Sequence, residues 1–270
     1  MRETEKKAFI GFPQPLLGDK SVRINIVSKG HDWFILNKPS GISLRQHPWD
    51  RNMPNIEHAL NLQLGQGKRE IMDMESTLLG SVYYMDMLMS GGALYAKSKA
   101  ALADLRNAYG SGLMKFKFHF LAQAKTQMED MFEIDTPLLP HQNKCQMIPS
   151  ISKGKQSKTK FSCINRGFDG WGLWEANVNF FRPHQIRIHA ALSGLKLMNE
   201  CIYSVVKAPT LKMIGMEKKM EDFKTPIFSD LALHLSRLEF KYPESKESLN
   251  KVKVPQSKSF RLACKYLHLL

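Results

Sequence analysis

The chain has 270 residues, of which 43% are hydrophobic and 24% are charged, a mixture that excludes an intrinsically disordered chain. Lysine and arginine outnumber aspartate and glutamate by 39 to 25, and the resulting net charge of +14 is typical of proteins that meet phosphate. A protein that binds anionic lipid would show the same excess. The four cysteines lie far apart without a C-x-x-C pair, which argues against a zinc site or a disulfide framework.

Nothing in the sequence indicates a membrane segment. No apolar run approaches the ~20 residues that cross a bilayer, and the opening residues lack the apolar core of a secretory signal. We therefore expect a cytoplasmic protein without membrane contact, and a monomer by default.

The first predicted region, residues 1–21, contains Pro13, Pro15 and Gly18 but no periodic apolar face, so we expect an N-terminal arm on the surface. This arm is too short for a separate N-terminal RNA-binding module. The remaining residues, 22–270, are predicted to form a single domain.

The next elements are two strands and two helices. Alternation over 22–26 predicts a half-buried strand, and the apolar run 33–36 predicts a second one that ends in a turn at 37–41. Pro54 and Gly65 are typical of the start and end of a helix. Ser98 is a suitable cap for a second helix, which Gly110 would end.

Strands dominate the second half of the sequence. Alternating apolar residues over 116–120, 174–180 and 231–235 predict strands with few helices between them. The order of elements predicts an α+β fold with a large, mostly antiparallel mixed sheet flanked by helices and loops, not a regular βαβ alternation. Residues 152–160 contain four lysines and are expected to form a solvated, mobile loop in preference to a dedicated phosphate clamp, although one loop could serve as both.

Three stretches place polar residues inside apolar elements, and the third of them, 33–41, contains Lys38, which alone says little. The first, 83–97, contains Asp86, and an acid in such surroundings costs desolvation energy unless it is paired or hydrogen-bonded. An isolated aspartate is usually a turn or capping residue, but Ser90-Gly91-Gly92 already supplies a turn here.

The second stretch, 180–192, is dense in hydrogen-bond donors. Pro183 is expected to start a helix, which would place His184 and Arg187 three residues apart on one face. We favour a core position for His189. Composition alone leaves Arg187 evenly divided between a surface salt bridge and a functional role.

Taken together, these stretches resemble the RluA-type pseudouridine synthases from about residue 22 to about residue 255. The family's N-K-P-x-G is matched by Asn37, Lys38, Pro39 and Gly41, and its H-R-L-D-x-x-T-S-G is matched at Asp86, Ser90 and Gly91, with Ala96 and Lys97 following. Its G-R-T-H-Q-I-R-V-H is matched at Arg182, His184, Gln185, Arg187 and His189, and Gly194, Glu200 and Tyr203 follow, with Glu200 in place of the family's Asp. The closing pattern is matched at Leu233, His234, Leu238, Phe240 and Pro243.

The resemblance implies a pseudouridine synthase-like fold and an isomerase that converts a uridine of ribosomal or transfer RNA to pseudouridine without a cofactor. It implies that Asp86 is the catalytic carboxylate and that Arg187 is its ion partner, which would lower the carboxyl pKa. Phe120 takes the place of the family's stacking tyrosine, whose ring supports the everted base. The residues expected to shape the pocket or contact phosphate are Lys38, Tyr84, Arg182, His184 and Gln185.

Several residues depart from the family pattern. Tyr83-Tyr84-Met85 replaces the family's H-R-L, so no arginine stands at position 84, and Phe120 lacks the tyrosine hydroxyl. Phe180-Phe181 and Pro183 replace the family's T-G and Thr around Arg182. These departures motivate an alternative, a catalytically impaired paralogue that binds RNA or acts in ribosome assembly. A third hypothesis, binding to a lipid surface, has no amphipathic helix in its favour.

Overall fold

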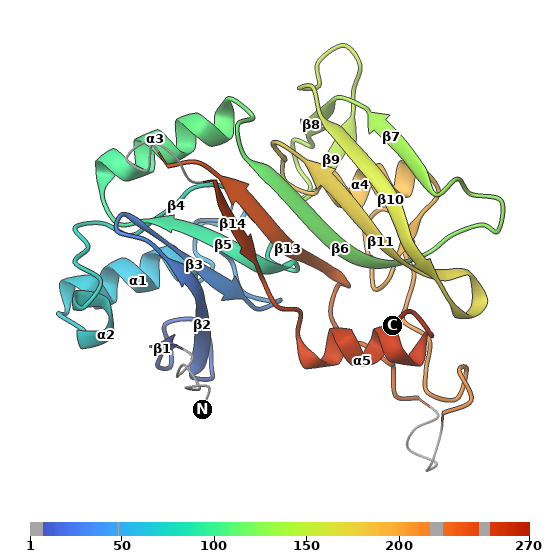
Figure 1. Cartoon of the computed structure of the whole chain (residues 1–270), viewed down its shortest axis with the longest axis horizontal. Helices are drawn as coiled ribbons and strands as arrows, with labels where there is room; N and C mark the ends of the chain where they lie inside the picture. Colours follow the sequence, from blue (N-terminus) through green and yellow to red (C-terminus); the bar gives the residue numbers. More distant parts are fainter. Residues whose placement is uncertain (1–7, 48, 217–223, 243–248) are drawn as a thin grey trace. The chain divides into compact units, whose positions relative to one another are not determined.

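A computed structural model describes residues 8–47, 49–216, 224–242 and 249–270 (Figure 1). They belong to two compact units, and the chain enters each of them twice. The first unit comprises Met1–Met114 and Arg237–Val254, and the second comprises Lys115–Ser236 and Pro255–Leu270. Sequence analysis treated residues 22–270 as one domain, and that organisation stays a prediction.

The first unit is built on an antiparallel sheet with the strand order β1-β2-β3-β5. Strand β4 also pairs with β5, and β14 pairs with the part of β13 that lies in this unit. The strands are β1 (Phe9–Phe12), β2 (Val22–Lys29), β3 (Trp33–Lys38), β4 (Gly80–Ser81), β5 (Ser90–Ala96), β13 (Leu233–Phe240) and β14 (Asn250–Lys253).

Strand β1 lies within the segment that was predicted to be a surface arm. Its Ile10 and Phe12 are buried, and it pairs with β2 from Phe9↔Asn25 to Phe12↔Val22. The arm prediction therefore missed a strand, because a four-residue strand with two buried side chains is too short to show a period. Residues 1–7 of the predicted arm lie outside the described residues.

The first unit contains the two predicted helices, which begin and end close to the predicted residues, and one short helix that was not predicted. They are α1 (Ile56–Gly65), α2 (Arg69–Met72) and α3 (Lys99–Gly110). The side chain of Asn55 accepts from the His58 N–H at 2.9 Å, so α1 begins two residues after Pro54. Ser98 caps α3 by accepting from the Ala101 N–H at 3.2 Å, as predicted.

The second unit has its own antiparallel sheet, in which the strands follow the order β7-β10-β11-β6-β12. A separate hairpin joins β8 and β9. The strands are β6 (Lys115–Gln123), β7 (Met131–Asp135), β8 (Leu138–Pro140), β9 (Met147–Pro149), β10 (Lys158–Arg166), β11 (Trp171–Val178) and β12 (Lys196–Leu197). The helices are the 3₁₀ turn η1 (Phe168–Gly170), α4 (Gln185–Leu192) and α5 (Lys258–Tyr266).

The lysine-rich segment 152–160 is only partly a loop. Its last three residues begin β10, where Thr159 is buried and where Lys158 and Lys160 lie 2.5 and 3.8 Å from the Glu133 carboxylate of β7. The prediction of a mobile loop is therefore wrong for residues 158–160. The strand was missed because alternate residues of β10 face solvent, so the lysines on its exposed side resemble those of a loop.

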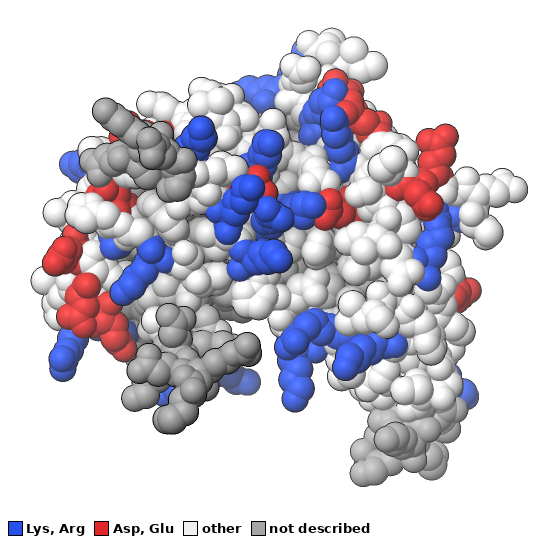
Figure 2. Space-filling view, in the orientation of Figure 1, with Lys and Arg blue, Asp and Glu red and all other residues white. Residues whose placement is uncertain are grey.

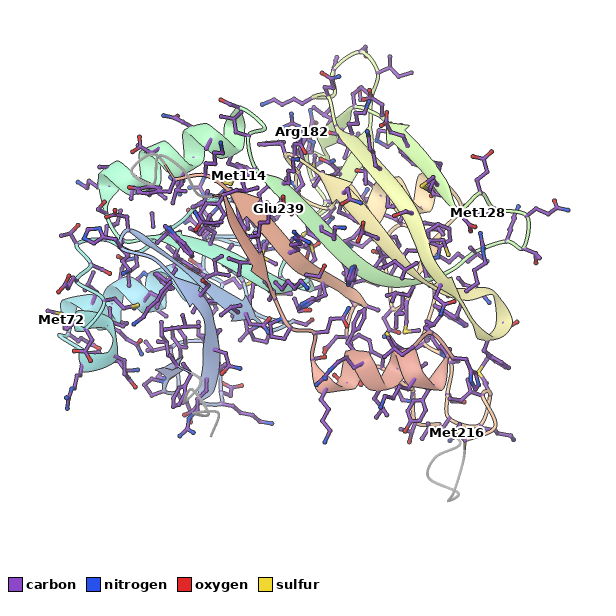
Figure 3. All side chains as sticks on the ribbon, in the orientation of Figure 1. Met72, Met114, Met128, Arg182, Met216 and Glu239 are labelled. Atoms are coloured by element: carbon purple, nitrogen blue, oxygen red, sulfur yellow. The ribbon has the colours of Figure 1, made fainter. Side chains whose placement is uncertain are left out.

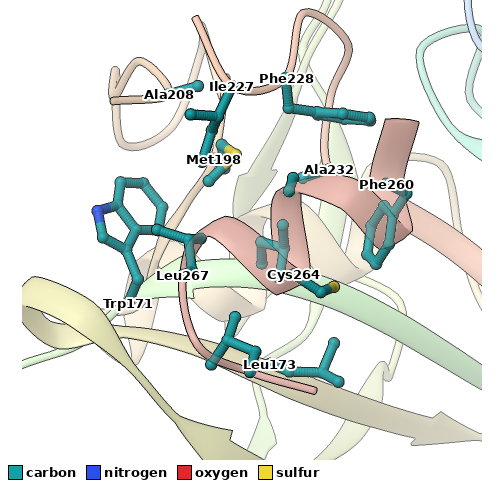
Figure 4. Close-up of a cluster of buried hydrophobic side chains, with 13 residues drawn as sticks. Trp171, Leu173, Met198, Ala208, Ile227, Phe228, Ala232, Phe260, Cys264 and Leu267 are labelled. Atoms are coloured by element: carbon teal, nitrogen blue, oxygen red, sulfur yellow. The ribbon is translucent and has the colours of Figure 1, made fainter. Parts of the chain in front are cut away.

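Helix α5 covers one hydrophobic core of the second unit (Figure 4). Phe260, Cys264 and Leu267 pack in this core with residues of β6, β11 and the chain after β12. The cations of α5 lie on its other, exposed face. Sequence analysis found no amphipathic helix, and α5 is one, but its apolar face is already buried within the unit and is closed to lipid. In the described part of the chain no helix has the length and apolar character that crossing a membrane requires.

Candidate active site

The predicted site residues fall in both units, and each is described within its own unit. Asp86 lies in the first unit, in the turn that leads into β5, and its side chain is 5% exposed. One carboxylate oxygen accepts from the Leu88 N–H at 3.0 Å, and the Asp86 carbonyl accepts from the Met89 N–H at 3.1 Å. These bonds close a tight turn, so the direction of the carboxylate is fixed by the backbone that follows it.

The N-K-P-x-G segment holds this turn in place. Strands β3 and β5 pair so that Lys38 lies opposite Gly91, which brings the end of β3 to the residues after Asp86. Ser40 donates its hydroxyl to the Leu88 carbonyl at 2.7 Å, and the Gly41 N–H donates to the Met87 carbonyl at 3.0 Å. Gly41 has a φ of +82°, a conformation that favours glycine and that aims its N–H at the turn.

Lys38 provides the strongest of these attachments. Its ammonium donates to the carbonyls of Pro39, Met87 and Met89 at 2.9, 3.0 and 2.6 Å, which accounts for its three donors. Burial lowers the pKa of Lys38 to about 7, and the negative charge of Asp86 opposes that shift. Lys38 was predicted to bind substrate, and the structure corrects this: its side chain is fully buried, so it positions the Asp86 turn.

The two tyrosines before Asp86 have different environments. Tyr83 belongs to the core, donating its hydroxyl to the Gly92 carbonyl at 2.7 Å and accepting from the Leu94 N–H at 3.2 Å. Tyr84 is 8% exposed, and the guanidinium carbon of the half-buried Arg45 lies 6.0 Å from the centre of its ring. The structure therefore brings a cation to position 84 from another segment.

Sequence analysis missed Arg45, and no pattern in the sequence could have identified it. Its position is fixed by neighbouring residues: the Ser43 hydroxyl donates to the Arg45 carbonyl at 2.8 Å, and the preceding Leu44 is buried. A second guanidinium in this unit, that of Arg106, donates to the Ser81 carbonyl at 2.9 Å. Burial and the positive charge of Arg45 both lower the pKa of Arg106.

In the second unit, Arg187 forms a buried ion pair with Glu200. Its Nε and Nη2 lie 2.6 and 2.8 Å from the two carboxylate oxygens, and both side chains are buried. Glu200 also accepts from the backbone N–H groups of Ile202 and Tyr203 at 2.7 and 3.3 Å. Burial pushes the pKa of Glu200 upward, but the bonds and charge of Arg187, together with these N–H groups, outweigh it and leave the pKa below its ordinary value.

The start of α4 differs from the prediction. Pro183 does not begin the helix, because His184 has a φ of +55° and α4 starts at Gln185. His184 therefore does not share a helical face with Arg187. Its Nδ1 lies 2.9 Å from the Tyr203 hydroxyl, which also accepts from the Met147 N–H at 2.7 Å. Tyr203 in turn lies beside Arg187, whose guanidinium carbon is 5.6 Å from its ring centre.

The other polar residues of this stretch connect α4 to its surroundings. The Gln185 amide donates to the Lys158 carbonyl and to the Thr159 hydroxyl at 3.0 and 3.1 Å, and its oxygen accepts from the Arg182 N–H. Gln185 is buried, so its predicted contact with substrate is replaced by a structural one. Arg182, labelled in Figure 3, is half-buried. Its guanidinium carbon lies 5.1 Å from the centre of the Phe180 ring.

The core position predicted for His189 is confirmed. It is fully buried between the Thr159 hydroxyl at 2.9 Å and the Thr136 carbonyl at 3.0 Å, and burial lowers its pKa.

Phe120 does not offer a stacking surface in this structure. Its side chain is 0% exposed, and its ring packs edge to face against Phe161 with 5.8 Å between ring centres. The alternation of Phe116, Phe118 and Phe120 reflects the buried face of β6. The prediction of a base-stacking floor at Phe120 is corrected to a core position. None of the described residues forms a group of three or more His, Cys, Asp or Glu side chains that could hold a metal ion.

Comparison with known proteins places this architecture. No protein-family model matches the chain. Two solved human structures, RNA Pseudouridylate Synthase Domain Containing 4 and Domain Containing 1, superpose with TM-scores of 0.68 and 0.58 at 15% and 16% identity. They cover 91% and 86% of this chain, and the matches extend over 93% and 83% of theirs. The chain therefore has a pseudouridine synthase-like fold, as predicted.

The curated relatives are more specific. An Uncharacterized RNA pseudouridine synthase of Helicobacter pylori is 23% identical over 251 residues, 90% of this chain and 69% of that protein. Ribosomal large subunit pseudouridine synthase D of Zymomonas mobilis is 23% identical over 87% of this chain and 71% of that protein. Dual-specificity RNA pseudouridine synthase RluA of Yersinia pestis is 26% identical over 48% of this chain and 64% of that protein. These relatives confirm the resemblance to RluA-type RNA pseudouridine synthases, which are isomerases.

Proposed function

We propose that the chain is an RNA pseudouridine synthase that isomerises a uridine of ribosomal or transfer RNA, with Asp86 as its catalytic carboxylate. The observation that supports this most is the attachment of the Asp86 turn: six hydrogen bonds from Lys38, Ser40, Gly41 and the turn's own Leu88 and Met89 hold residues 86–89. Such attachment keeps a reacting group in one geometry, which is how a protein lowers the entropy cost of a reaction.

A carboxylate suits the reaction because it must stay ionised to attack the sugar or the base, or to remove a sugar proton. The assignment of Arg187 as an ion partner, which the family resemblance implies, stays a prediction; within its own unit Arg187 pairs with Glu200. Two of its five N–H donors bond Glu200, and this bidentate pair holds the guanidinium plane in one orientation. In this proposal Glu200 acts as a positioning residue for Arg187.

Arg45 and Tyr84 are proposed to take over the role of the arginine that the family has at position 84. A guanidinium that lies over an aromatic ring offers both charge for phosphate and a flat surface for a base. This contact addresses one of the departures that motivate the catalytically impaired alternative, the missing arginine at position 84. The buried Phe120, which offers no stacking surface, remains in favour of that alternative. Arg182 remains a candidate for contact with RNA because it is half-buried, whereas His184 is buried against the Tyr203 hydroxyl. A cytoplasmic location and a monomeric state stay predictions.

The proposal is tested by replacing Asp86 with Asn, which keeps the side-chain volume but removes the charge. Pseudouridine in cellular RNA is mapped by carbodiimide chemistry in a deletion strain complemented with wild-type protein, Asp86→Asn or the matched control Asp104→Asn on the exposed face of α3. We expect one or more sites to disappear in the deletion and Asp86→Asn strains and to return with the wild type and the control. A deletion that erases no site would refute the enzymatic function.

A further inference from the structure

A hairpin in the first unit presents an excess of positive charge on one face. In the β13–β14 hairpin, Leu238, Phe240 and Val252 are buried, so the alternate residues point outward. The outward residues are Arg237, Glu239, Lys241, Lys251 and Lys253, four cations and one acid, and we call them the basic ribbon. Figure 2 shows Lys and Arg side chains gathered over β13 and β14, and Glu239 lies on β13 in Figure 3.

The register of the hairpin places like charges side by side. Arg237 lies directly opposite Lys253, and Glu239 lies opposite Lys251. Like charges at directly opposite positions destabilise an antiparallel pair, and the one acid is already engaged, because it lies 2.7 Å from Arg237. The two lysines of β14 have no carboxylate partner among the described residues. The hairpin therefore holds positive charge that its own sheet does not neutralise.

The basic ribbon is anchored through its inner side, and its three lysines are exposed while Arg237 and Glu239 are half-buried. Its inner side packs against β3 and β5: the rings of Trp33 and Phe240 meet edge to face at 5.0 Å, and a Cβ on Gly92 would lie 2.3 Å from Leu238. Alternate residues of a strand lie about 7 Å apart along it, a repeat similar to the phosphate spacing of a nucleic-acid strand. A row of fixed cations at this spacing fits a phosphodiester backbone better than a single anion.

We propose that the basic ribbon is an RNA-docking surface, outside the catalytic residues, that binds the phosphate backbone of the substrate. This inference rests on the proposed function for its choice of RNA as the partner. It assigns Lys251 and Lys253 to phosphate contacts, and it makes Glu239 a residue that limits affinity. Base identity is not recognised here, because backbone contacts contain no sequence information.

The test measures the affinity of the full-length protein for an unmodified transfer RNA transcribed in vitro, between about 50 and 200 mM salt, a range in which phosphate contacts change affinity strongly. We expect Lys251→Gln/Lys253→Gln to reduce the slope of log affinity against log salt by about 1.4–1.8, as the loss of two phosphate contacts predicts. The control, Lys20→Gln/Lys99→Gln, removes the same charge from exposed lysines elsewhere in the first unit. An equal loss of slope in both variants would show that only net charge matters and would overturn the proposal.

A variant that is expected to bind RNA more tightly excludes misfolding as the explanation for weaker binding by the double variant. Glu239→Gln removes the only acid of the basic ribbon and is expected to raise affinity for the same RNA at moderate salt, which a damaged fold would not do. Unchanged or weaker binding would count against the proposal. If the double variant instead loses binding to phosphatidylserine vesicles and keeps its RNA affinity, the surface binds lipid and the proposal is wrong.

Failure of the proposed function can be distinguished from failure of this inference. Asp86→Asn should keep the full salt slope while forming no pseudouridine. If the wild-type protein forms no pseudouridine, but its salt slope still exceeds that of the Lys251→Gln/Lys253→Gln variant by the expected amount, the RNA-docking surface stands and the enzymatic function fails.

Discussion

The two units position their candidate residues by different means. In the first unit, a buried ammonium donates to backbone carbonyls and so holds the turn that contains Asp86. In the second, a buried guanidinium is held by a carboxylate side chain and that carboxylate by backbone N–H groups. The first arrangement needs one particular side chain, because carbonyls are present whatever the sequence. The second needs two, so either substitution breaks it.

The largest effect is expected from breaking the ion pair of the second unit. Glu200→Gln leaves a buried guanidinium without a carboxylate and should lower the free energy of unfolding by about 3–5 kcal/mol. Chemical denaturation of the variant measures this loss. The matched control is Glu133→Gln, which removes an exposed carboxylate beside Lys158 in the same unit and should cost about 0–1 kcal/mol. Similar losses of unfolding free energy in the two variants would contradict the prediction that the buried pair contributes more than an exposed one.

The Arg187–Glu200 pair also predicts that the free energy of unfolding decreases at acid pH. The pKa of Glu200 is lower in the folded protein than its ordinary 4.5, so its contribution is complete above that value and is lost as the pH falls below it. Denaturation curves between about pH 3 and 7 should show this loss in the wild type and less of it in Glu200→Gln. Parallel pH dependence of both proteins would contradict the assignment.

The next effect is expected at Lys38. Lys38→Met leaves three carbonyl acceptors without their donor and should lower the free energy of unfolding by about 1–3 kcal/mol, with a larger loss of pseudouridine formation because the Asp86 turn loosens. Ser40→Ala removes one bond to the same turn and should cost about 1 kcal/mol. Loss of stability without loss of activity in Lys38→Met would separate the turn from catalysis.

Sequence patterns predicted the parts of the site that depend on neighbours in the chain. The turn at 37–41 and the cap at Ser98 are local features, and His189 could be placed by the apolar residues around it. The cap at Asn55 was not predicted, although Pro54 marked the start of that helix to within two residues. The burial of Lys38 was not predictable in the same way, because its acceptors Met87 and Met89 lie about fifty residues along the chain. Motif position suggested that Lys38 binds substrate, and packing made it a structural residue.

Errors at other positions have a similar origin. Phe120 alternates like a strand residue, and alternation alone does not tell a buried ring from one that faces a ligand. The pairing of Arg187 with Glu200 joins residues on a helix and in a later loop, and only the departure from the family's Asp drew attention to Glu200. No sequence pattern indicated a role for Arg45. The closing motif is described at Leu233, His234, Leu238 and Phe240, whereas Pro243 lies outside the described residues.

The pH dependence of Lys38 sharpens the comparison further, because it should move stability and activity in opposite directions. Its pKa is about 7 in the folded protein and 10.5 ordinarily, so between these values the unfolded chain binds more protons and stability rises with pH. Over the same range the neutral amine has one donor fewer than the three carbonyls need, and activity should fall. Lys38→Met should lose this rise in stability, and a wild type whose activity also rises above pH 7 would contradict the role of the ammonium.

The smallest effect is expected at Arg45, where the change concerns RNA and not the fold. Arg45→Gln removes the guanidinium from the ring of Tyr84, a contact of about 0.5–1 kcal/mol, and should weaken RNA binding or turnover about two- to fivefold. Arg45→Lys keeps the charge but not the flat guanidinium, so partial recovery indicates charge and no recovery indicates stacking. Arg45 is half-buried and takes no part in the ion pair of the second unit. The free energy of unfolding of the Arg45→Gln protein should therefore differ little from that of the wild type. A stability loss as large as that of Lys38→Met would make Arg45 a structural residue.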